Sequence, residues 1–370
     1  MMTRTRFIAL GTRARITGRD CCERYPGFQT YISGVEKKSV GPELSVIMPV
    51  YNSAPYLETA VQSILGQTFE DFEFIIVDDG STDGSAQFLQ SLGDSRVVLL
   101  SNNENRGLIY SLNLGVAVAR GQYIARMDAD DVSVKHRFQK QINFLREHPE
   151  CAVCGTWARL MDAHGELGRT WKRVTQPDEV RAALLFQSPL IHPSVMGKSE
   201  VFKAHPYNPE AVHCEDYALW LELAEHGYRL CNLGEVLLHY RLHGSNISVV
   251  KAQIQRQHAD EMLQRHLMRR LGLRLSEREL ELNRLWFAGK VELKAIQFSW
   301  SELRALGKKL IEGNTARSKN DVSTLQAILC IRWWLVSFKL RALCRSGFPK
   351  MGATMGTMAW RLPSLLYKMI

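Results

Sequence analysis

The chain has 370 residues, of which 45% are apolar, 23% charged and 9% aromatic. This length leaves room for two domains, and the composition excludes wholesale disorder, collagen-like repeats and a multi-span membrane protein. The net charge of +9 is uneven, with balances of +4 over residues 1–43, −8 over 44–248 and +13 over 249–370. An acidic middle beside a basic C-terminal third argues against a uniformly basic nucleic-acid binder. It favours a catalytic body joined to a part that meets an anionic surface.

The start of the chain is basic. Residues 1–19 contain five arginines and no acidic side chain. No apolar h-region follows, so a secretory signal peptide is excluded. We predict that residues 1–43 form a disordered basic leader, and a start codon assigned too early would give the same pattern. No stretch reaches the roughly 18–20 uncharged apolar residues of a membrane span.

Apolar stretches alternate with helix-periodic stretches over residues 44–131. The helices are predicted to begin at Asn52 or Ser53, at Asp83 and at Gly107. The alternation is typical of an α/β fold with a Rossmann-like, mostly parallel sheet and helices on both faces. The predicted strands are 44–50, 72–77, 97–100 and 123–127.

Beyond this region the pattern becomes less regular. A strand predicted over 151–160 would bury Cys151 and Cys154 as core residues in a reducing cytoplasm. They are not expected to bind zinc, because no second cysteine pair completes a site. A helix is predicted over 216–225, and Gly227 is expected to end it.

The composition changes again after Ser248, where the sequence becomes basic and rich in residues that favour helices. We therefore place domain boundaries near residues 43 and 248. Residues 44–248 form the predicted catalytic domain, and residues 249–370 form a predicted helical C-terminal region.

Polar residues follow three of the predicted strands at the point where each strand ends. In parallel sheets, ligands bind beyond the carboxyl ends of the strands, so these positions predict an active site at one edge. The polar clusters are Tyr51-Asn52, Asp78-Asp79 and Asp128-Ala-Asp-Asp131.

The cluster of Asp128, Asp130 and Asp131 allows two interpretations. Three adjacent anions repel one another unless a cation or hydrogen-bond donors offset their charge. A hard divalent ion that bridges to a diphosphate would do so. The other interpretation is a solvated acidic turn in which Asp131 caps a helix.

The remaining candidates are individually ambiguous. Tyr51 offers an aromatic face, and Asp79 can accept from the N–H edge of a nucleobase, but such residues are common in turns. Arg106 either pairs with an anion or is a surface residue. The carboxylates of Glu215 and Asp216 either stabilise a helix N-terminus or supply a general base.

Six segments, taken together, resemble the family 2 glycosyltransferases in sequence and in order over residues 44–248. The resemblance implies a GT-A fold, in which a Rossmann-like nucleotide-binding half merges with an acceptor-binding half. It also implies sugar transfer from a nucleotide diphosphate donor with inversion at the anomeric carbon. The segments are Pro49-Val-Tyr-Asn52, Val77-Asp-Asp-Gly-Ser-Thr-Asp83, Asn105-Arg-Gly107, Met127-Asp-Ala-Asp-Asp131, Glu215-Asp-Tyr-Ala-Leu-Trp220 and Tyr240-Arg-Leu-His243.

The resemblance implies a nucleotide pocket in the first half. Tyr51 and Asp79 would contact the base, commonly uracil. Pro49 and Asn52 would shape the same pocket, and Arg106 would lie beside the nucleotide.

It also implies a metal site next to that pocket. Asp128 would contact the ribose, while Asp130, together with Asp131, would bind Mn²⁺ or Mg²⁺. His243 matches a position that coordinates the metal in some relatives, although a lone histidine is more often structural.

On the acceptor side, the resemblance implies that Asp216 is the general base for the attacking hydroxyl. One such carboxylate is enough for a single displacement with inversion. His192, Glu215 and Trp220 would lie near the acceptor.

An apolar helical stripe with basic neighbours is predicted near the C-terminus. Tryptophan with lysine and arginine on an amphipathic helix suits the headgroup region of an anionic membrane. The alternative is a helix packed on the catalytic body or on a second subunit. The stripe is Leu325, Leu329, Trp333, Val336, Leu340 and Leu343, with Trp334, Lys339, Arg341 and Arg345 nearby.

These observations lead to one principal hypothesis. The chain would be an inverting, metal-dependent, hexosyltransferase-type enzyme that uses a nucleotide-sugar donor, UDP-linked, and a glycan or lipid-linked glycan acceptor. It would act in cell-envelope, capsular or O-antigen polysaccharide synthesis, in the cytoplasm or peripherally on the inner face of the plasma membrane. The alternative is a catalytically inactive nucleotide-sugar-binding partner or scaffold. No nucleic-acid partner is expected, because no RNA-binding motif is present.

Overall fold

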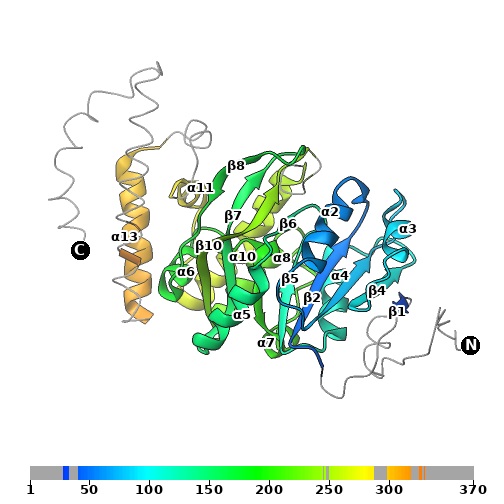
Figure 1. Ribbon diagram of the computed structural model, residues 1–370. Helices are drawn as coiled ribbons and strands as arrows, with labels where there is room; N and C mark the ends of the chain where they lie inside the picture. The colour runs from blue at the N-terminus through cyan, green and yellow to red at the C-terminus, as the bar shows by residue number, and fades with distance from the viewer. Residues whose placement is uncertain are drawn as a thin grey trace, which may run out of the picture. The chain divides into compact units, whose positions relative to one another are not determined.

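The computed structural model describes residues 28–32, 41–244, 246, 250–286, 298–317, 325, 326 and 329 (Figure 1). These residues fall into two compact units. The first comprises the residues up to Pro177 together with Leu190–His258, and the second comprises Asp178–Pro189 and the residues from Ala259 onward. The assignment of Asp178–Pro189 to the second unit was not predicted from the sequence.

A mixed sheet forms the centre of the first unit. Its strands span Phe28–Ile32 (β1), Leu44–Val50 (β2), Phe72–Asp78 (β3), Val97–Asn102 (β4), Tyr123–Arg126 (β5), Val132–Ser133 (β6), Cys151–Met161 (β7), Leu167–Trp171 (β8), Met196–Lys198 (β9) and Arg229–Arg241 (β10). Among the described residues the strand order is β1-β4-β3-β2-β5-β9-β7-β10-β6, and β8 pairs with β7 outside this path.

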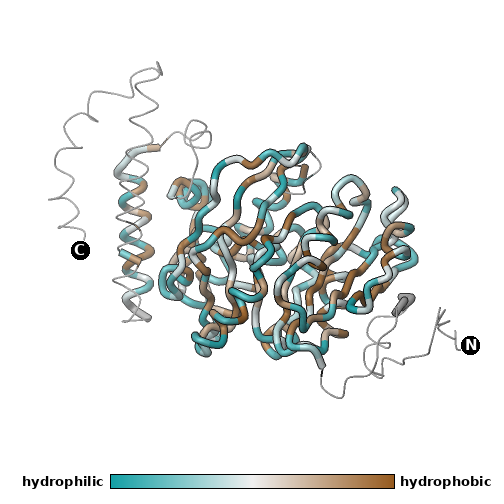
Figure 2. The backbone as a smooth tube through the Cα atoms, in the orientation of Figure 1, coloured by the Kyte–Doolittle hydropathy of each residue, from teal (hydrophilic) through white to brown (hydrophobic). Residues whose placement is uncertain are grey.

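The first half of the sheet confirms the predicted parallel arrangement. β4, β3, β2 and β5 are neighbours and run parallel, so their carboxyl ends share one edge. β2 and β3 are buried along their whole length, and the backbone there is coloured mainly hydrophobic in Figure 2. β1 pairs antiparallel with β4, so the prediction of a disordered leader is wrong for residues 28–32. Residues 1–27 and 33–40 lie outside the described part of the chain.

The second half of the sheet is mixed, which the sequence pattern did not predict. β9 runs antiparallel to both β5 and β7, whereas β7 and β10 are parallel to each other. Cys151 and Cys154 are buried in β7, as expected. The strand β10 was missed because its pairing with β7 shifts register between Leu233 and Val236, which interrupts the regular alternation.

Helices cover both faces of the sheet. The helices α2 (Ala54–Leu65) and α5 (Arg137–Glu147) pack on the face that presents Val46 and Met48. α4 crosses the other face so closely that a Cβ atom at Gly115 would lie 2.5 Å from Cγ2 of Ile47. The helices of this unit include α2 (Ala54–Leu65), α3 (Ser85–Gln90), α4 (Leu108–Val118), α5 (Arg137–Glu147), α7 (Ser199–Ala204) and α8 (Glu215–Glu225).

One carboxylate serves two helix starts. The side chain of Ser53 makes no capping bond at α2, although Ser53 occupies the N-cap position. Instead, Asp83 Oδ2 accepts from the Ala54 N–H at 2.9 Å, and Asp83 Oδ1 accepts from the Ser85 N–H at 3.0 Å. Asp83 therefore links the starts of α2 and α3, whereas the sequence predicted only the second contact.

The second unit is helical and has its own core. It includes α6 (Pro177–Ala183), the part of α10 (Ala252–Leu271) after His258, α11 (Glu277–Leu285) and α13 (Trp300–Arg317). Asn283 donates to the Leu185 carbonyl at 2.8 Å, and Trp286 is buried with its ring against Phe186. Hydrophilic and hydrophobic segments alternate along α13 (Figure 2).

Two residues of the predicted C-terminal stripe are described, and both are buried. Leu325 is 0% and Leu329 is 1% exposed, which favours the packing alternative for these two side chains. The rest of the stripe, from Trp333 onward, lies outside the described residues. Within the described part of the chain, no helix combines the length and the hydrophobicity needed to cross a membrane.

Candidate functional site

The loops after β2 and β3 are joined at the carboxyl edge of the sheet. Asn52, which has a positive φ of 49°, accepts at its side-chain oxygen from the Thr82 N–H at 2.8 Å. The Asn52 N–H donates to the Ser81 hydroxyl at 3.0 Å, and the Asp79 N–H donates to the Val50 carbonyl at 2.8 Å. The predicted juxtaposition of these two strand ends is therefore present.

Asp79 holds the loop that leads into α4. One carboxylate oxygen accepts from the Asn102 amide at 2.6 Å and from the Arg106 N–H at 3.0 Å, and the other accepts from the Gly107 N–H at 2.8 Å. Gly107 has a φ of 92°, which glycine adopts without strain. A carboxylate offers about four acceptor sites, so one remains for a further donor. Asp79 itself is only 3% exposed.

The remaining predicted nucleotide contacts differ in exposure. Tyr51 is 48% exposed, which is unusual for a large aromatic side chain, whereas Pro49 is buried within β2. Arg106 is exposed; its guanidinium donates to the Tyr110 hydroxyl at 2.8 Å and lies over the Tyr110 ring.

Three carboxylates converge after β5. Asp128, Asp130 and Asp131 each offer an oxygen within 4.8 Å of the others. Asp128 also forms a two-contact ion pair with the buried Arg126. Burial raises the pKa of Asp128 to about 6 although Arg126 opposes the rise, and Asp130 and Asp216 increase it further.

Asp131 is the most deeply buried of the three, at 1% exposed. Its Oδ1 accepts from the Arg241 N–H at 2.8 Å, while its Oδ2 is buried without a hydrogen-bond partner among the described residues. Burial, together with Asp130, raises its pKa well above the ordinary value. The alternative of a helix cap is wrong for Asp131, because the strand β6 follows it.

Asp130 is contacted from the end of β10. His243 Nε2 lies 2.8 Å from Asp130 Oδ2, and the Asn246 amide lies 3.4 Å from the same oxygen. The ring of Tyr56 packs 5.0 Å from the His243 ring, between centroids. The fold thus brings His243 to the acidic cluster, as predicted.

The start of α8 supplies two more carboxylates. Glu215 is 7% exposed, and burial together with the Asp216 charge raises its pKa to about 7. Asp216 is half-buried. The Asp128 charge contributes to the raised pKa of Glu215, and the Asp216 charge contributes to that of Asp128, so the acidic cluster and the start of α8 are neighbours.

His192 links Glu215 to two aromatic side chains, Tyr207 and Trp220. His192 Nε2 is 2.9 Å from the Tyr207 hydroxyl, and its Nδ1 is 3.8 Å from Glu215. Burial lowers the pKa of His192 well below its ordinary value, so we interpret the His192–Glu215 contact as neutral rather than as an ion pair. Trp220 is 0% exposed and packs edge-on against His192. It therefore supports His192 from within the core and offers no surface to an acceptor.

Sequence reasoning missed several residues of the site. Arg126, Tyr207, Arg241 and Asn246 all contact the predicted residues. Arg126 did carry a signal, since an arginine inside an apolar strand that ends in aspartates requires a buried partner.

Comparison with known proteins shows which family the chain belongs to. Residues 45–204 match the family described as Glycosyl transferase family 2. The O-antigen biosynthesis glycosyltransferase WbnJ of Escherichia coli is 31% identical over 207 residues, which cover 55% of this chain and 81% of WbnJ. The chain belongs to the family 2 glycosyltransferases.

Two further proteins resemble this glycosyltransferase. The UDP-Glc:alpha-D-GlcNAc-diphosphoundecaprenol beta-1,3-glucosyltransferase WfaP of Escherichia coli is 28% identical over 212 residues, covering 56% of the chain and 80% of WfaP. The crystal structure of S. aureus TarS 1-349 in complex with UDP-GlcNAc has a TM-score of 0.53 and 17% identity, covering 81% of this chain and 92% of that one. The likeness to TarS shows that this glycosyltransferase has the GT-A fold.

Proposed function

We propose that the chain is an inverting, metal-dependent hexosyltransferase that uses a nucleotide-diphosphate sugar, with UDP as the expected nucleotide. One observation carries this proposal: Asp128, Asp130 and Asp131 converge after β5, and Asp216 at the start of α8 is near enough for its charge to raise the pKa of Asp128. A leaving diphosphate and an attacking hydroxyl would need these two groups within one site.

The nucleotide would bind beyond β2 and β3. The exposed ring of Tyr51 is available to stack on a base, and Asp79 retains one acceptor site for a base N–H. Pro49, near the carboxyl end of β2, and Asn52, in the loop that follows β2, would form the wall of this pocket. Arg106 would lie beside the phosphates. The ribose is assigned to Asp128.

A hard divalent cation fits the acidic cluster. The three carboxylates converge, and the buried Asp131 Oδ2 has no hydrogen-bond partner among the described residues. Asp130 and Asp131, with His243 as a third ligand, would hold Mn²⁺ or Mg²⁺. When bound, such an ion would neutralise the negative charge that develops on the departing diphosphate.

Asp216 is the proposed general base. Of the two carboxylates at the start of α8, Glu215 is buried and its raised pKa favours the protonated form below about pH 7. The half-buried Asp216 is therefore better suited to take a proton from an acceptor hydroxyl. One base is sufficient for a single displacement, which inverts the anomeric carbon. His192 would border the acceptor, positioned by Tyr207 and Trp220.

The biological setting is inferred from relatives. WbnJ acts in O-antigen biosynthesis, and the name of WfaP specifies a diphosphoundecaprenol-linked acceptor. We therefore assign this enzyme to cell-envelope polysaccharide synthesis on a lipid-linked glycan. It would work at the cytoplasmic face, with the basic C-terminal region near the anionic membrane surface.

Calorimetric titration of UDP with and without Mn²⁺ tests the donor site. We expect Mn²⁺ to strengthen UDP binding by the wild type and to have no effect on UDP binding by Asp130→Ala. The control Asp178→Ala, whose side chain is 55% exposed in the wild type, should bind UDP as the wild type does. Failure to bind UDP, GDP or dTDP would overturn the proposal. Metal-dependent binding without transfer to any lipid-linked acceptor would favour the inactive binding partner.

A further inference from the structure

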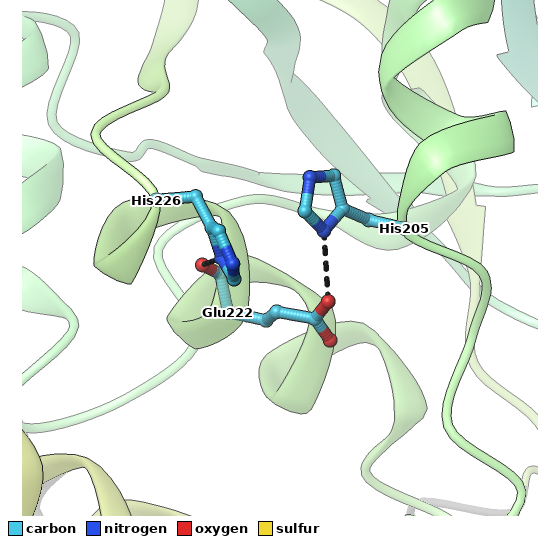
Figure 3. A group of neighbouring side chains, drawn as sticks. All are labelled: His205, Glu222 and His226. Carbon is cyan, nitrogen blue, oxygen red and sulfur yellow. Dashed lines mark hydrogen bonds and ion pairs between the residues drawn. The ribbon is translucent and has the colours of Figure 1, made fainter.

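A second cluster of metal-binding side chains lies at the other end of α8. His205, Glu222 and His226 each offer one ligand atom within 4.8 Å of the other two. Figure 3 shows the ring of His205, the residue after α7, facing the Glu222 carboxylate, and the ring of His226, the residue after α8, beside the Glu222 backbone. His205 and Glu222 are half-buried, whereas His226 is exposed, so the cluster is open to solvent.

The local structure already orients these ligands. Glu222 lies in the last turn of α8, and His226, four residues further on, is the C-cap residue of that helix. His226 Nδ1 lies 2.9 Å from the Glu222 backbone carbonyl, which can only accept, so Nδ1 carries the proton. The lone pair of His226 therefore resides on Nε2, as in histidines whose other nitrogen is held by a carbonyl in metal sites. His205 is fixed by its Nδ1, which lies 2.8 Å from the Glu222 carboxylate.

We propose that His205, Glu222 and His226 bind a borderline divalent ion, Zn²⁺, with water in the fourth position. Two imidazoles and one carboxylate form a ligand set that suits zinc, whereas the all-carboxylate cluster at Asp128–Asp131 suits Mg²⁺ or Mn²⁺. In a tetrahedral site with Zn–N distances near 2.0 Å, ligand atoms stand roughly 3.3 Å apart. The flexible Glu222 and the exposed His226 can close the remaining gap.

Zinc here would tie the end of α7 to the C-terminal part of α8. The connection between these helices carries Tyr207, whose hydroxyl holds His192 and whose N–H donates to Asn113 at 2.9 Å. The ion would therefore clamp a segment that supports the acceptor side of the catalytic site. Without zinc, the cluster would rely on the His205–Glu222 contact, the His226–Glu222 carbonyl bond and the packing of the two imidazole rings, whose centroids lie 4.6 Å apart.

Cobalt substitution in the full-length protein provides a selective test. Two imidazoles, a carboxylate and water give four-coordinate Co²⁺ with intense visible absorption bands, whereas an all-oxygen octahedral site absorbs weakly. We expect these bands in the wild type and in Asp130→Ala. They should be lost in His226→Ala and Glu222→Gln, and Zn²⁺, but not excess Mg²⁺, should displace the cobalt. The exposed His148, which pairs with Glu150 and belongs to no three-ligand group among the described residues, provides the control His148→Ala.

Affinity and stability give the second readout. Zn²⁺ titrated into the metal-free protein should raise the Tm of the wild type, and His226→Ala should bind at least about tenfold more weakly. Because His226 is exposed at a helix end, its replacement leaves the core intact, which circular dichroism will verify. Unchanged cobalt bands in His226→Ala, or a thiolate charge-transfer band indicating cysteine ligands, would overturn the proposal. A Tm shift that is equal in wild type and His226→Ala would do the same.

Discussion

His243 Nε2 and Asp130 Oδ2 lie 2.8 Å apart, although 113 residues separate them in the chain. The contact exists because β6, immediately after the acidic cluster, pairs with β10, immediately before His243. Tyr56 and Asn246 hold the imidazole from two further sides. The sheet topology, and not any local motif, thus builds this corner of the site.

The first prediction concerns His243. His243→Ala should weaken Mn²⁺ binding by about 10–100-fold, because the imidazole is either a ligand or the group that orients Asp130. Calorimetric Mn²⁺ titration in the presence of UDP measures this effect. The control is His148→Ala, an exposed histidine that lies just before β7 and pairs with Glu150. Equal Mn²⁺ affinity in wild type and His243→Ala would remove His243 from the metal site.

The two carboxylates at the start of α8 should differ sharply in catalysis. Asp216→Asn should lower kcat by about 10²–10⁴-fold, the usual contribution of a general base, with nucleotide affinity retained. Glu215→Gln keeps the hydrogen-bonding shape of a protonated carboxyl group and should retain most of the activity. The measurement is initial rate of transfer from a UDP-sugar. If Glu215→Gln is the more damaging change, the base is assigned to the wrong residue.

Glu215 should also make stability depend on pH. Its pKa is raised from about 4.5 in the unfolded chain to about 7 in the fold, so folding favours the protonated form. Stability is therefore lost as pH rises from about 4.5 through 7, and deprotonated Glu215 should cost about 1–3 kcal/mol at pH 8.

Urea unfolding at pH 5 and pH 8 checks this sign. Glu215→Gln should be more stable than the wild type at pH 8 and similar to it at pH 5. The buried His192, with its lowered pKa, also destabilises the fold towards acid pH, so the test is the difference between the two proteins at each pH and not the absolute stability of either. A stability difference that does not change with pH would contradict the prediction.

Gly115 should be intolerant of even one added methyl group. The Cβ of alanine there would meet Ile47 Cγ2 at 2.5 Å, and overpacking of this kind costs about 1–3 kcal/mol. Gly115→Ala should lower the free energy of unfolding by that amount, whereas Gly93→Ala, with open space around it, should not. Ile47→Leu moves the offending methyl group and should rescue Gly115→Ala. Additive effects in this double-mutant cycle would show that the contact is not the cause.

The parallel half of the sheet and the placement of its polar ends followed from sequence because both depend on local periodicity. The apolar runs correctly predicted β2 and β3, and Asp79 and Asp130 lie, as expected, just after the carboxyl ends of parallel strands. By contrast, β10 carries a register shift near Gly234, which hides its alternation. Periodicity gives no warning of such a bulge.

The partners of the site residues were less predictable. Arg126 and Tyr207 become neighbours of Glu215 only through tertiary packing. The burial of Trp220 likewise depends on how α8 packs against the rest of the domain. The sequence showed Trp220 on an apolar helical stripe, but it did not show the edge-on contact with His192.

The bonds made by Asp79 have a thermodynamic consequence. They fix Asn102, Arg106 and Gly107 through contacts internal to the chain, so the conformational entropy of this loop is lost during folding and not upon ligand capture. A nucleotide bound here, as we propose, would meet a surface that is already assembled, and little of its binding free energy would be spent on ordering protein. Loosening the loop, for example by Asp79→Ala, would accordingly appear in calorimetry as an entropic deficit, alongside the loss of any direct contact.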